Sequence, residues 1–214
     1  MRSLIKKMMK RIYDKLYMLS FIMTRIKTRL WYGLFLKECG KGCYLEKPIK
    51  ITPYCVSLKN NVMIMRDCRI EGVSYYEGKR YTPNIIFMEN VSIQQDLHLT
   101  CANEVIIGKN TAIAANVTIT DINHPYEDIS RPIERQVLEV KKVIIGEDSK
   151  IYNNAVILPG VRIGKHCVIG ANSIVAGNIP DFSVAAGAPA RVIRKYDPVK
   201  KKWLIVKKVI EHER

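Results

Sequence analysis

An aliphatic residue recurs at every sixth position through the second half of the chain. In the stretch ILPGVRIGKHCVIGANSIVAG (residues 157–177) and the residues before it, this step is kept by Ile145, Ile151, Ile157, Ile163, Ile169 and Val175. Neither the 3.6-residue period of a helix nor the two-residue alternation of a strand produces such a spacing. The period is typical of a solenoid, in which each unit buries its apolar side against the next.

The repeat begins near residue 58 and is interrupted twice, the second time over residues 121–142. Its earlier members are Leu58, Ile64, Ile70, Phe87, Ile93, Leu99, Ile107, Ile113 and Ile119. A compact residue often lies two positions before the aliphatic one, as at Cys68, Ser149 and Cys167. We predict a triangular coil of three short strands, with the aliphatic residue inside and the compact one near each corner. Glycine is expected to supply the corner conformations, at Gly108, Gly146, Gly164 and Gly170.

The formal net charge of +15 is concentrated at the two ends of the chain. Residues 1–37 contain ten Lys or Arg and one Asp, whereas residues 191–214 contain nine Lys or Arg and three acids. The middle is electroneutral. An anionic partner would therefore meet mainly the ends.

The basic N-terminal segment has the pattern of an amphipathic helix. Apolar residues recur at steps of three and four from Ile5 to Met23, and lysines and arginines occupy the other side. This face either packs on the protein, on its own domain or on a neighbouring subunit, or lies in a membrane interface, and the cation excess favours a membrane. Charges interrupt the segment too often for a signal peptide, and its longest uncharged run is far below the roughly 20 residues of a membrane span.

The six cysteines lack paired CxxC spacing, and we expect free thiols and a reducing compartment. Near the C-terminus, Asp197 followed by Pro198 predicts the start of a short helix containing Trp203, Leu204, Val206 and Ile210, which would cap one end of the coil. We therefore divide the chain into a basic helical segment (1–50), a β-helix with the loop 121–142 (51–190) and a basic tail with a helix (191–214).

These repeats resemble those of the hexapeptide-repeat acyltransferases, over roughly residues 58–195. The resemblance implies a mainly β protein folded as a left-handed parallel β-helix. The interruption TDINHPYEDISRPI (residues 120–133) resembles the active-site loop of maltose, galactoside and capsule or lipopolysaccharide O-acetyltransferases. By itself, a histidine in an exposed loop indicates no function. The resemblance makes His124 the general base, followed by Pro125 and Arg131 in the order of the family.

Further site residues are implied by the same resemblance. Asp121 is a candidate for orienting the imidazole or touching substrate, and Gln94 lies near the position where relatives hold the acceptor sugar with an Asn. The donor would be acetyl-CoA, without a metal. Its phosphates and pantetheine arm are expected to contact Asn153, Ala171, Ala176, Arg191 and Arg194. Two departures are Lys150, where relatives commonly carry Trp, and Gly177, where some carry Lys.

The implied reaction is direct acetyl transfer from acetyl-CoA to a sugar hydroxyl, with His124 removing the hydroxyl proton. The acceptor would be a surface polysaccharide or a lipid-linked saccharide. The protein would be a homotrimer in the cytoplasm, at the inner face of the membrane through residues 1–37. An amino sugar or another small molecule as acceptor would make it an N-acetyltransferase. Two other classes are less favoured: a metal enzyme resembling γ-carbonic anhydrases, whose converging histidines this sequence spaces widely, and a non-enzymatic scaffold. No nucleic-acid-binding motif is found.

Overall fold

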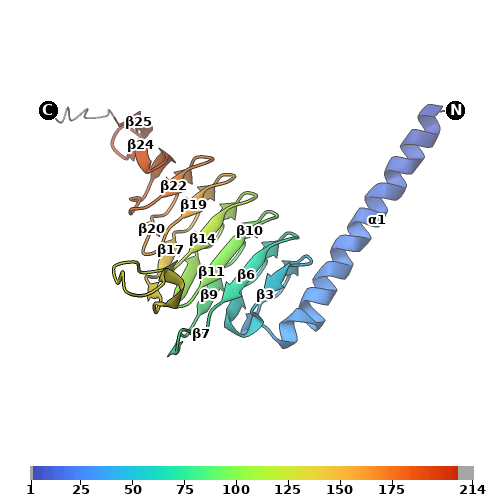
Figure 1. Cartoon of the computed structure of the whole chain (residues 1–214). Coiled ribbons are helices and arrows are strands. Elements are labelled where there is room, and N and C mark those ends of the chain that lie inside the picture. Colours follow the sequence, from blue (N-terminus) through green and yellow to red (C-terminus); the bar gives the residue numbers. More distant parts are fainter. Residues whose placement is uncertain (1, 207–214) are drawn as a thin grey trace.

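The computed structural model describes residues 2–206, and a parallel β-helix forms most of it (Figure 1). The chain visits three sheets in a fixed order, which we call A, B and C, and all strands within the coils are parallel. The A sheet contains β1 (Glu38–Cys39), β4 (Val56–Leu58), β9 (Asn84–Phe87), β12 (Glu104–Ile107), β17 (Val143–Ile145) and β20 (Arg162–Ile163). The B sheet contains β2 (Tyr44–Leu45), β5 (Met63–Ile64), β10 (Ser92–Ile93), β13 (Ala112–Ile113), β18 (Lys150–Ile151), β21 (Val168–Ile169) and β23 (Ser183–Gly187). The C sheet contains β3 (Lys50–Ile51), β6 (Arg69–Gly72), β11 (His98–Cys101), β14 (Thr118–Thr120), β19 (Val156–Ile157) and β22 (Ile174–Val175).

The aliphatic repeat fills the interior of this prism, as predicted. Members of one column stack directly, as in the register Leu58↔Phe87↔Ile107↔Ile145↔Ile163 of the A sheet. Each of these side chains is at most 1% exposed. Burying one of them contributes about 1.5–3 kcal/mol, so the stack supplies much of the fold's stability. The compact residues of the repeat are buried next to the corners, including Cys68, Ser149 and Cys167.

The corners do not use glycine as expected. The left-handed backbone position is occupied instead by Asn and Asp in most coils, for example Asn90, Asn110 and Asp148, each with φ between 55° and 59°. Their short polar side chains tolerate this conformation and hydrogen-bond from coil to coil, at 2.9 Å for both Asn90 to Asn110 and Asn110 to Asp148. The glycines serve close approach: a Cβ on Gly146 would lie 2.5 Å from the backbone carbon of Gly164.

The β-helix begins earlier than the predicted boundary at residue 51. Helix α1 (Arg2–Leu30) ends at Leu30, the 3-10 turn η1 (Tyr32–Leu34) comes next, and β1 already pairs with β4. The first coil keeps the hexad as Cys39, Leu45 and Ile51, in register with Leu58, Ile64 and Ile70. A seven-residue step from Ile51 to Leu58, which accommodates the 3-10 turn η2 (Pro53–Cys55), breaks the periodicity there.

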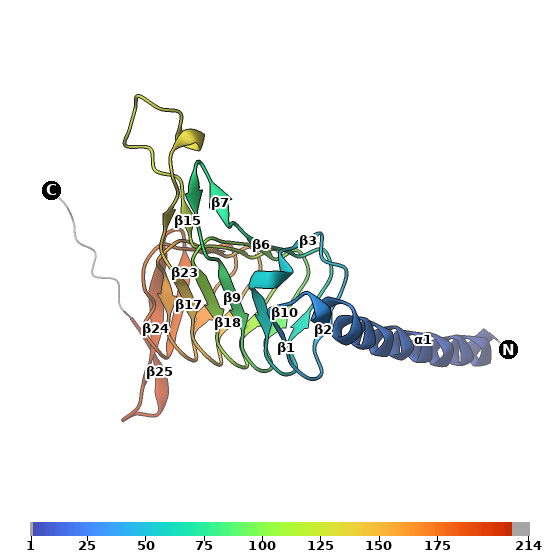
Figure 2. The same cartoon turned by 90° about the horizontal axis from the view of Figure 1, so that it is seen from below.

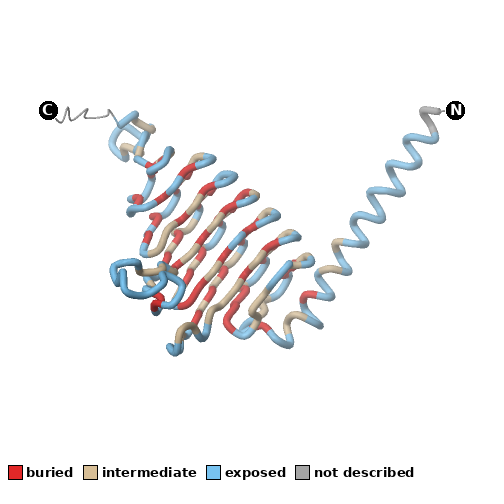
Figure 3. Tube along the Cα trace, in the orientation of Figure 1, coloured by how far each residue is buried: buried red, intermediate tan, exposed pale blue. Residues whose placement is uncertain are grey.

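Helix α1 extends away from the prism like an arm (Figures 1 and 2). Contacts concentrate at its C-terminal end: the Phe21 ring lies 4.7 Å from the Tyr44 ring, and Thr28 Oγ1 accepts a 2.9 Å bond from the Leu45 N–H. The rest of the helix leaves its apolar side chains exposed, so it does not cover its own domain (Figure 3). No helix of residues 2–206 combines the length and apolarity that a membrane crossing needs.

The predicted C-terminal helix is wrong. Strands β24 (Ala190–Asp197) and β25 (Lys202–Ile205) form an antiparallel hairpin that continues the B sheet beyond β23. Asp197 Oδ1 accepts bonds from the N–H groups of Val199 and Lys200 at 2.9 and 3.0 Å. Asp followed by Pro starts turns as well as helices, and tertiary pairing with β23 favours the strand here. Ile210, also assigned to that helix, lies outside the described residues.

Candidate active site

Two insertions project from the same edge of the prism, where the chain passes from the C sheet to the A sheet (Figure 2). The first is the hairpin β7 (Tyr75–Tyr76) and β8 (Lys79–Arg80). The second is the loop 121–142, whose base is closed by β15 (Ile122–Asn123) and β16 (Glu139–Val140) and which carries the 3-10 turn η3 (Ile133–Arg135). One coil separates their starting points, so the hairpin and the loop lie side by side.

The hairpin braces the loop through polar contacts. The Tyr76 hydroxyl donates to the Glu134 backbone oxygen at 2.7 Å and lies 2.9 Å from Glu134 Oε2. The Tyr81 hydroxyl donates to the Leu138 carbonyl at 3.3 Å. Arg135 Nη1 lies 3.2 Å from Glu77 Oε1. Burial and the hydrogen bond to the Glu134 carboxylate raise the pKa of the Tyr76 phenol, which therefore remains a neutral donor.

His124 is held between these two insertions. Its ring packs edge-on against the Tyr76 ring, with 5.5 Å between centroids. Its side chain is 36% exposed, but Nδ1 is buried and has no hydrogen-bond partner among the described residues. The nearest acceptor is Glu134 Oε2 at 3.9 Å, just beyond hydrogen-bond distance. A proton on Nδ1 facing this carboxylate would leave Nε2 free to act as a base.

A cleft with a volume of about 260 Å³ lies beside His124 over the outer face of the C sheet. Its wall includes Thr100 and Thr120, whose hydroxyls are 2.9 Å apart. Its charged lining is Arg69 and Glu71, on β6. Hydroxyls, a carboxylate and a guanidinium are the groups that recognise polar, hydroxylated ligands.

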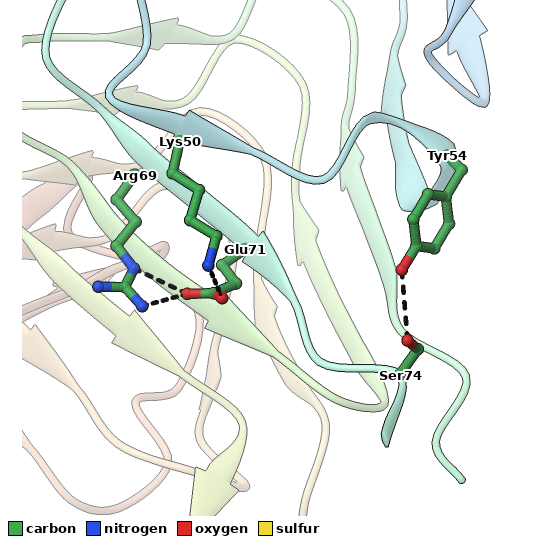
Figure 4. Close-up of polar contacts among 5 residues, drawn as sticks. All are labelled: Lys50, Tyr54, Arg69, Glu71 and Ser74. Atoms are coloured by element: carbon green, nitrogen blue, oxygen red, sulfur yellow. Dashed lines mark hydrogen bonds and ion pairs between the residues drawn. The ribbon is translucent and has the colours of Figure 1, made fainter. Parts of the chain in front are cut away.

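Glu71 is the centre of an ion cluster in this wall (Figure 4). Its carboxylate pairs with Lys50 Nζ and accepts a 2.8 Å bond from Arg69 Nε. Partial burial acts to raise the pKa of this carboxyl, but the hydrogen bonds and charges of Arg69 and Lys50 outweigh it and hold the pKa below the ordinary value. Close by, the Tyr54 hydroxyl lies 3.3 Å from Ser74 Oγ, where the first insertion leaves the prism (Figure 4).

Asp121 does not reach the imidazole, and its candidate role in orienting His124 is wrong. The carboxylate is fully buried and accepts three backbone N–H bonds of 2.8 Å, from Ala102, Asn103 and Glu104. Cys101 Sγ lies 3.3 Å from Oδ2. Burial and the neighbouring Asp121 charge raise the pKa of the Cys101 thiol, which stays protonated. Asp121 thus fixes the turn between β11 and β12 from the base of the loop.

The two expected acceptor residues lie outside the cleft lining. Arg131 is exposed, and its Nη2 donates a 2.6 Å bond to the Arg135 carbonyl within the loop. Buried Gln136 supports the same part of the loop by donating from Nε2 to the Asp128 carbonyl at 3.0 Å. Gln94 lies at the corner between the B and C sheets, at another edge of the prism from His124.

The expected donor residues also belong to other parts of the surface. Asn153 and Ala171 stack on successive coils at the corner between B and C, exposed, in keeping with the register Lys150↔Val168. Ala176 comes directly after β22 on the C-to-A edge. Arg191 and Arg194 are exposed on β24, opposite Ala186 and Val184 of β23. A single chain therefore does not gather donor and acceptor residues around His124.

Sequence reasoning missed the residues of the first insertion and the C-sheet wall: Tyr76, Glu134, Arg69, Glu71, Thr100 and Thr120. A signal was available, because both interruptions come after the third hexad of a coil, after Ile70 and after Ile119. Equal phase in a three-sided coil places two insertions on one edge. In residues 2–206, all six cysteines are free and no group of three His, Cys, Asp or Glu side chains is placed to hold a metal.

These coils define the class of protein: a parallel β-helix built on a hexapeptide repeat. The family model "Bacterial transferase hexapeptide (six repeats)" matches residues 142–177. The chain is 39% identical to the putative lipopolysaccharide biosynthesis O-acetyl transferase WbbJ of Escherichia coli (strain K12), over 56% of this chain and 64% of the relative. It is 38% identical to the galactoside O-acetyltransferase of Lactococcus lactis, over 52% of this chain and 53% of the relative.

A solved structure with the same fold is that of AntD, an N-acyltransferase from Bacillus cereus, in complex with dTDP and coenzyme A. Its TM-score is 0.64 at 19% identity, over 78% of this chain and 88% of that one. The match with the transferase hexapeptide model and the O-acetyltransferase relatives confirms the resemblance to hexapeptide-repeat acyltransferases. The chain spans less than two thirds of the length of the curated relatives that it matches first, at 64%, 36% and 58%.

Proposed function

We propose that this protein is an acetyl-CoA-dependent O-acetyltransferase that modifies a sugar hydroxyl of a surface polysaccharide or a lipid-linked saccharide. The observation that carries the proposal is His124, a half-exposed imidazole fixed by two insertions beside a polar cleft on a transferase hexapeptide scaffold. The relatives named for O-acetylation of lipopolysaccharide and galactosides support this acceptor class. We also propose that the coil is left-handed, as the repeat implies.

In this mechanism, His124 Nε2 takes the proton of the acceptor hydroxyl as the oxygen attacks the thioester carbonyl. The C–S bond then breaks, the acetyl ester forms, and the proton returns to the coenzyme A thiolate. A thioester is already activated, so positioning and a base supply much of the rate. The Arg69 and Glu71 groups and the threonine hydroxyls of the cleft would hold the sugar through its hydroxyls.

Glu134 and Tyr76 are positioning residues in this proposal. The Glu134 carboxylate faces buried Nδ1 at 3.9 Å, and the Tyr76 hydroxyl holds the carboxylate in place. Catalytic hydrogen bonds are often long in unliganded sites and shorten in the reactive complex. A proton on Nδ1 would then point at Glu134, and the attacking group would meet the basic Nε2.

A homotrimer would complete the site, because the donor residues and Gln94 lie away from the His124 cleft within one chain. The outer face of the A sheet is suited to subunit packing. There, Ile86, Ile106 and Ile144 form a half-buried apolar column in register on β9, β12 and β17. We propose that Asn153, Ala171, Ala176, Arg191 and Arg194 of one subunit bring acetyl-CoA to the His124 cleft of the next.

We further propose that α1 and residues up to 37 contact the inner face of the cell membrane from the cytoplasm. The apolar side chains of α1 are exposed, and its lysines and arginines suit anionic headgroups. Free cysteines fit a reducing compartment. An acceptor attached to a membrane lipid would be reached directly from this position.

The test is acetyl-CoA consumption with a panel of sugar and amino-sugar acceptors, using the full chain and the variants His124→Ala and His166→Ala. His166 is an exposed histidine at the corner between A and B and serves as the control. Loss of a general base lowers kcat by about 10²–10⁴-fold, so His124→Ala should lose activity and His166→Ala should keep it. Unchanged transfer by His124→Ala would overturn the assignment. Lability of the product to hydroxylamine distinguishes an ester from the amide of an N-acetyltransferase.

A further inference from the structure

A cavity with a volume of about 230 Å³ lies at the root of α1, where the helix meets the first coil. One wall is the side chains of Arg25 and Arg29, one helical turn apart on the same face of α1. The other wall is the turn 39–43 between β1 and β2, which includes Lys41 and the left-handed Gly42, with φ of 71°. This cavity is separate from the His124 cleft and shares no lining residue with it.

The positive charge of this cavity is not neutralised by the protein. Within residues 2–206, no carboxylate forms an ion pair with Arg25, Arg29 or Lys41. Arg29 Nη1 donates to the Cys39 carbonyl at 2.6 Å, and the Arg25 guanidinium lies 4.7 Å from the centroid of the Phe21 ring. Both arginines are thereby oriented while keeping N–H donors for another partner.

The rest of the lining offers no compensating negative charge. Burial raises the pKa of the Cys43 thiol to about 11, and the thiol donates to the Lys59 carbonyl at 2.9 Å. It is therefore neutral at physiological pH. The adjacent carboxylate of Glu38 is engaged by Lys59, with Nζ–Oε distances of 2.7 and 2.8 Å. Three cations around one cavity without an acid favour an anion as the occupant.

The position of the cavity indicates which anion. Helix α1 continues from it with exposed apolar side chains, including Leu19, Ile22, Met23 and Ile26. Such a helix lies in a membrane at the level where acyl chains meet headgroups. The cations at its root would then stand at the depth of the lipid phosphates.

We propose that this cavity binds the phosphate group of an anionic phospholipid headgroup. The proposal rests on the membrane contact of α1 proposed above and adds a defined site to it. Arg25 and Arg29 would donate to the phosphate oxygens, and Lys41 would add a third positive charge from the prism side. Binding would fix the angle between the prism and the membrane, because the phosphate contacts both α1 and the first coil.

The experiment compares three full-length proteins: the wild type, the cavity variant R25Q/R29Q/K41Q and the control variant K6Q/K7Q/K10Q. Both variants lose three positive charges, and the control lysines are exposed on α1 away from the cavity. Binding is measured by flotation with vesicles of phosphatidylcholine and phosphatidylglycerol in equal parts. In a second arm, inorganic phosphate is titrated into each protein by calorimetry. Each cation near an anionic surface contributes roughly fivefold to affinity, so both variants should bind vesicles less tightly.

We expect the cavity variant to lose at least a further tenfold relative to the control, and to lose the phosphate response that the wild type and the control retain. Equal losses for the two variants, or no phosphate binding by the wild type, would overturn the proposal. Cavity-dependent phosphate binding without vesicle binding would show that the membrane contact is wrong and the ligand is a soluble phosphate. The variant R25Q/K41Q keeps the Arg29 bond to Cys39 and serves if the triple variant is unstable. Failure of acetyl transfer is measured separately and bears only on the proposed activity.

Discussion

The prism and the helix α1 use the same kinds of apolar residue and reach opposite results. Ile107 in the prism is 0% exposed, whereas Ile12 on α1 is 44% exposed and Leu16 is 60% exposed. The repeat closes on itself, because every coil covers the aliphatic residues of its neighbours. The helix has one face for a surface that this chain does not supply. A stable scaffold and a docking arm can therefore be built in one chain from similar composition.

The largest difference between the two regions should appear on truncating an aliphatic residue in each. Ile107→Ala creates a cavity in the prism and should lower the free energy of unfolding by about 2–5 kcal/mol. Ile12→Ala, on the exposed helix, should change it by less than about 0.5 kcal/mol. Urea unfolding followed by circular dichroism without lipid measures both. Equal effects would show that α1 packs on the protein in solution.

Close approach of coils gives a second contrast, between two glycines of the prism. A Cβ at Gly146 would meet the Gly164 backbone at 2.5 Å, whereas one at Gly177 meets nothing within 4 Å. Gly146→Ala should destabilise the fold by about 1–3 kcal/mol, and Gly177→Ala should be neutral or slightly stabilising. Thermal unfolding separates the two. A neutral Gly146→Ala would mean that the coils can move apart freely.

Asp121 tests whether the turn it holds is part of the rigid prism. Asp121→Asn keeps the shape but replaces one acceptor oxygen by an amide that faces backbone N–H donors, which should cost about 1–2 kcal/mol. Asp14→Asn on α1 is the matched control and should leave the unfolding midpoint unchanged. If Asp121 touched the imidazole, its variant would lose activity without losing stability. The opposite pattern is expected.

The ion cluster of Glu71 gives a smaller, pH-dependent contribution. The pKa of Glu71 is lowered in the folded state, so its stabilisation is present above the ordinary value of 4.5 and is lost as pH falls through the folded pKa. The midpoint difference between wild type and Glu71→Gln should therefore be largest near neutral pH and vanish in acid. Glu127→Gln, in the exposed loop, is the control. A difference that grows toward low pH would contradict this sign.

The smallest effect on stability is expected from removing most of the arm. A chain that starts at residue 20 keeps the Phe21–Tyr44 contact and the Thr28 bond to Leu45. Its unfolding midpoint should match that of the full chain, while binding to anionic vesicles should be lost. A lower midpoint would mean that the arm stabilises the prism. Vesicle binding that persists would place the membrane contact elsewhere.

The hexad alone predicts the three-sided coil, because its period admits neither a helix nor an ordinary strand. It also predicts which residues are buried, as Ile145 and Val175 show. Corner chemistry was less visible: Asn, Asp and Gly all occur near turns, and contact between coils decides that glycine serves packing and Asn90 or Asn110 the left-handed position. The Asp-Pro pair at 197–198 was ambiguous for the same reason, since a local turn signal does not specify whether a helix or a strand comes after the turn.

For the candidate site, the sequence by itself determined His124 and the loop that carries it, because the interruption and its His-Pro pair are local features. The tertiary structure decided which side chains surround the imidazole. Tyr76 and Glu134 are 58 residues apart in the chain and meet because both insertions leave the prism at one edge. It also decided that Asp121, close to His124 in sequence, turns inward to backbone N–H groups. Proximity along the chain fixes neither the direction of a side chain nor its partners, and these depend on how successive coils stack.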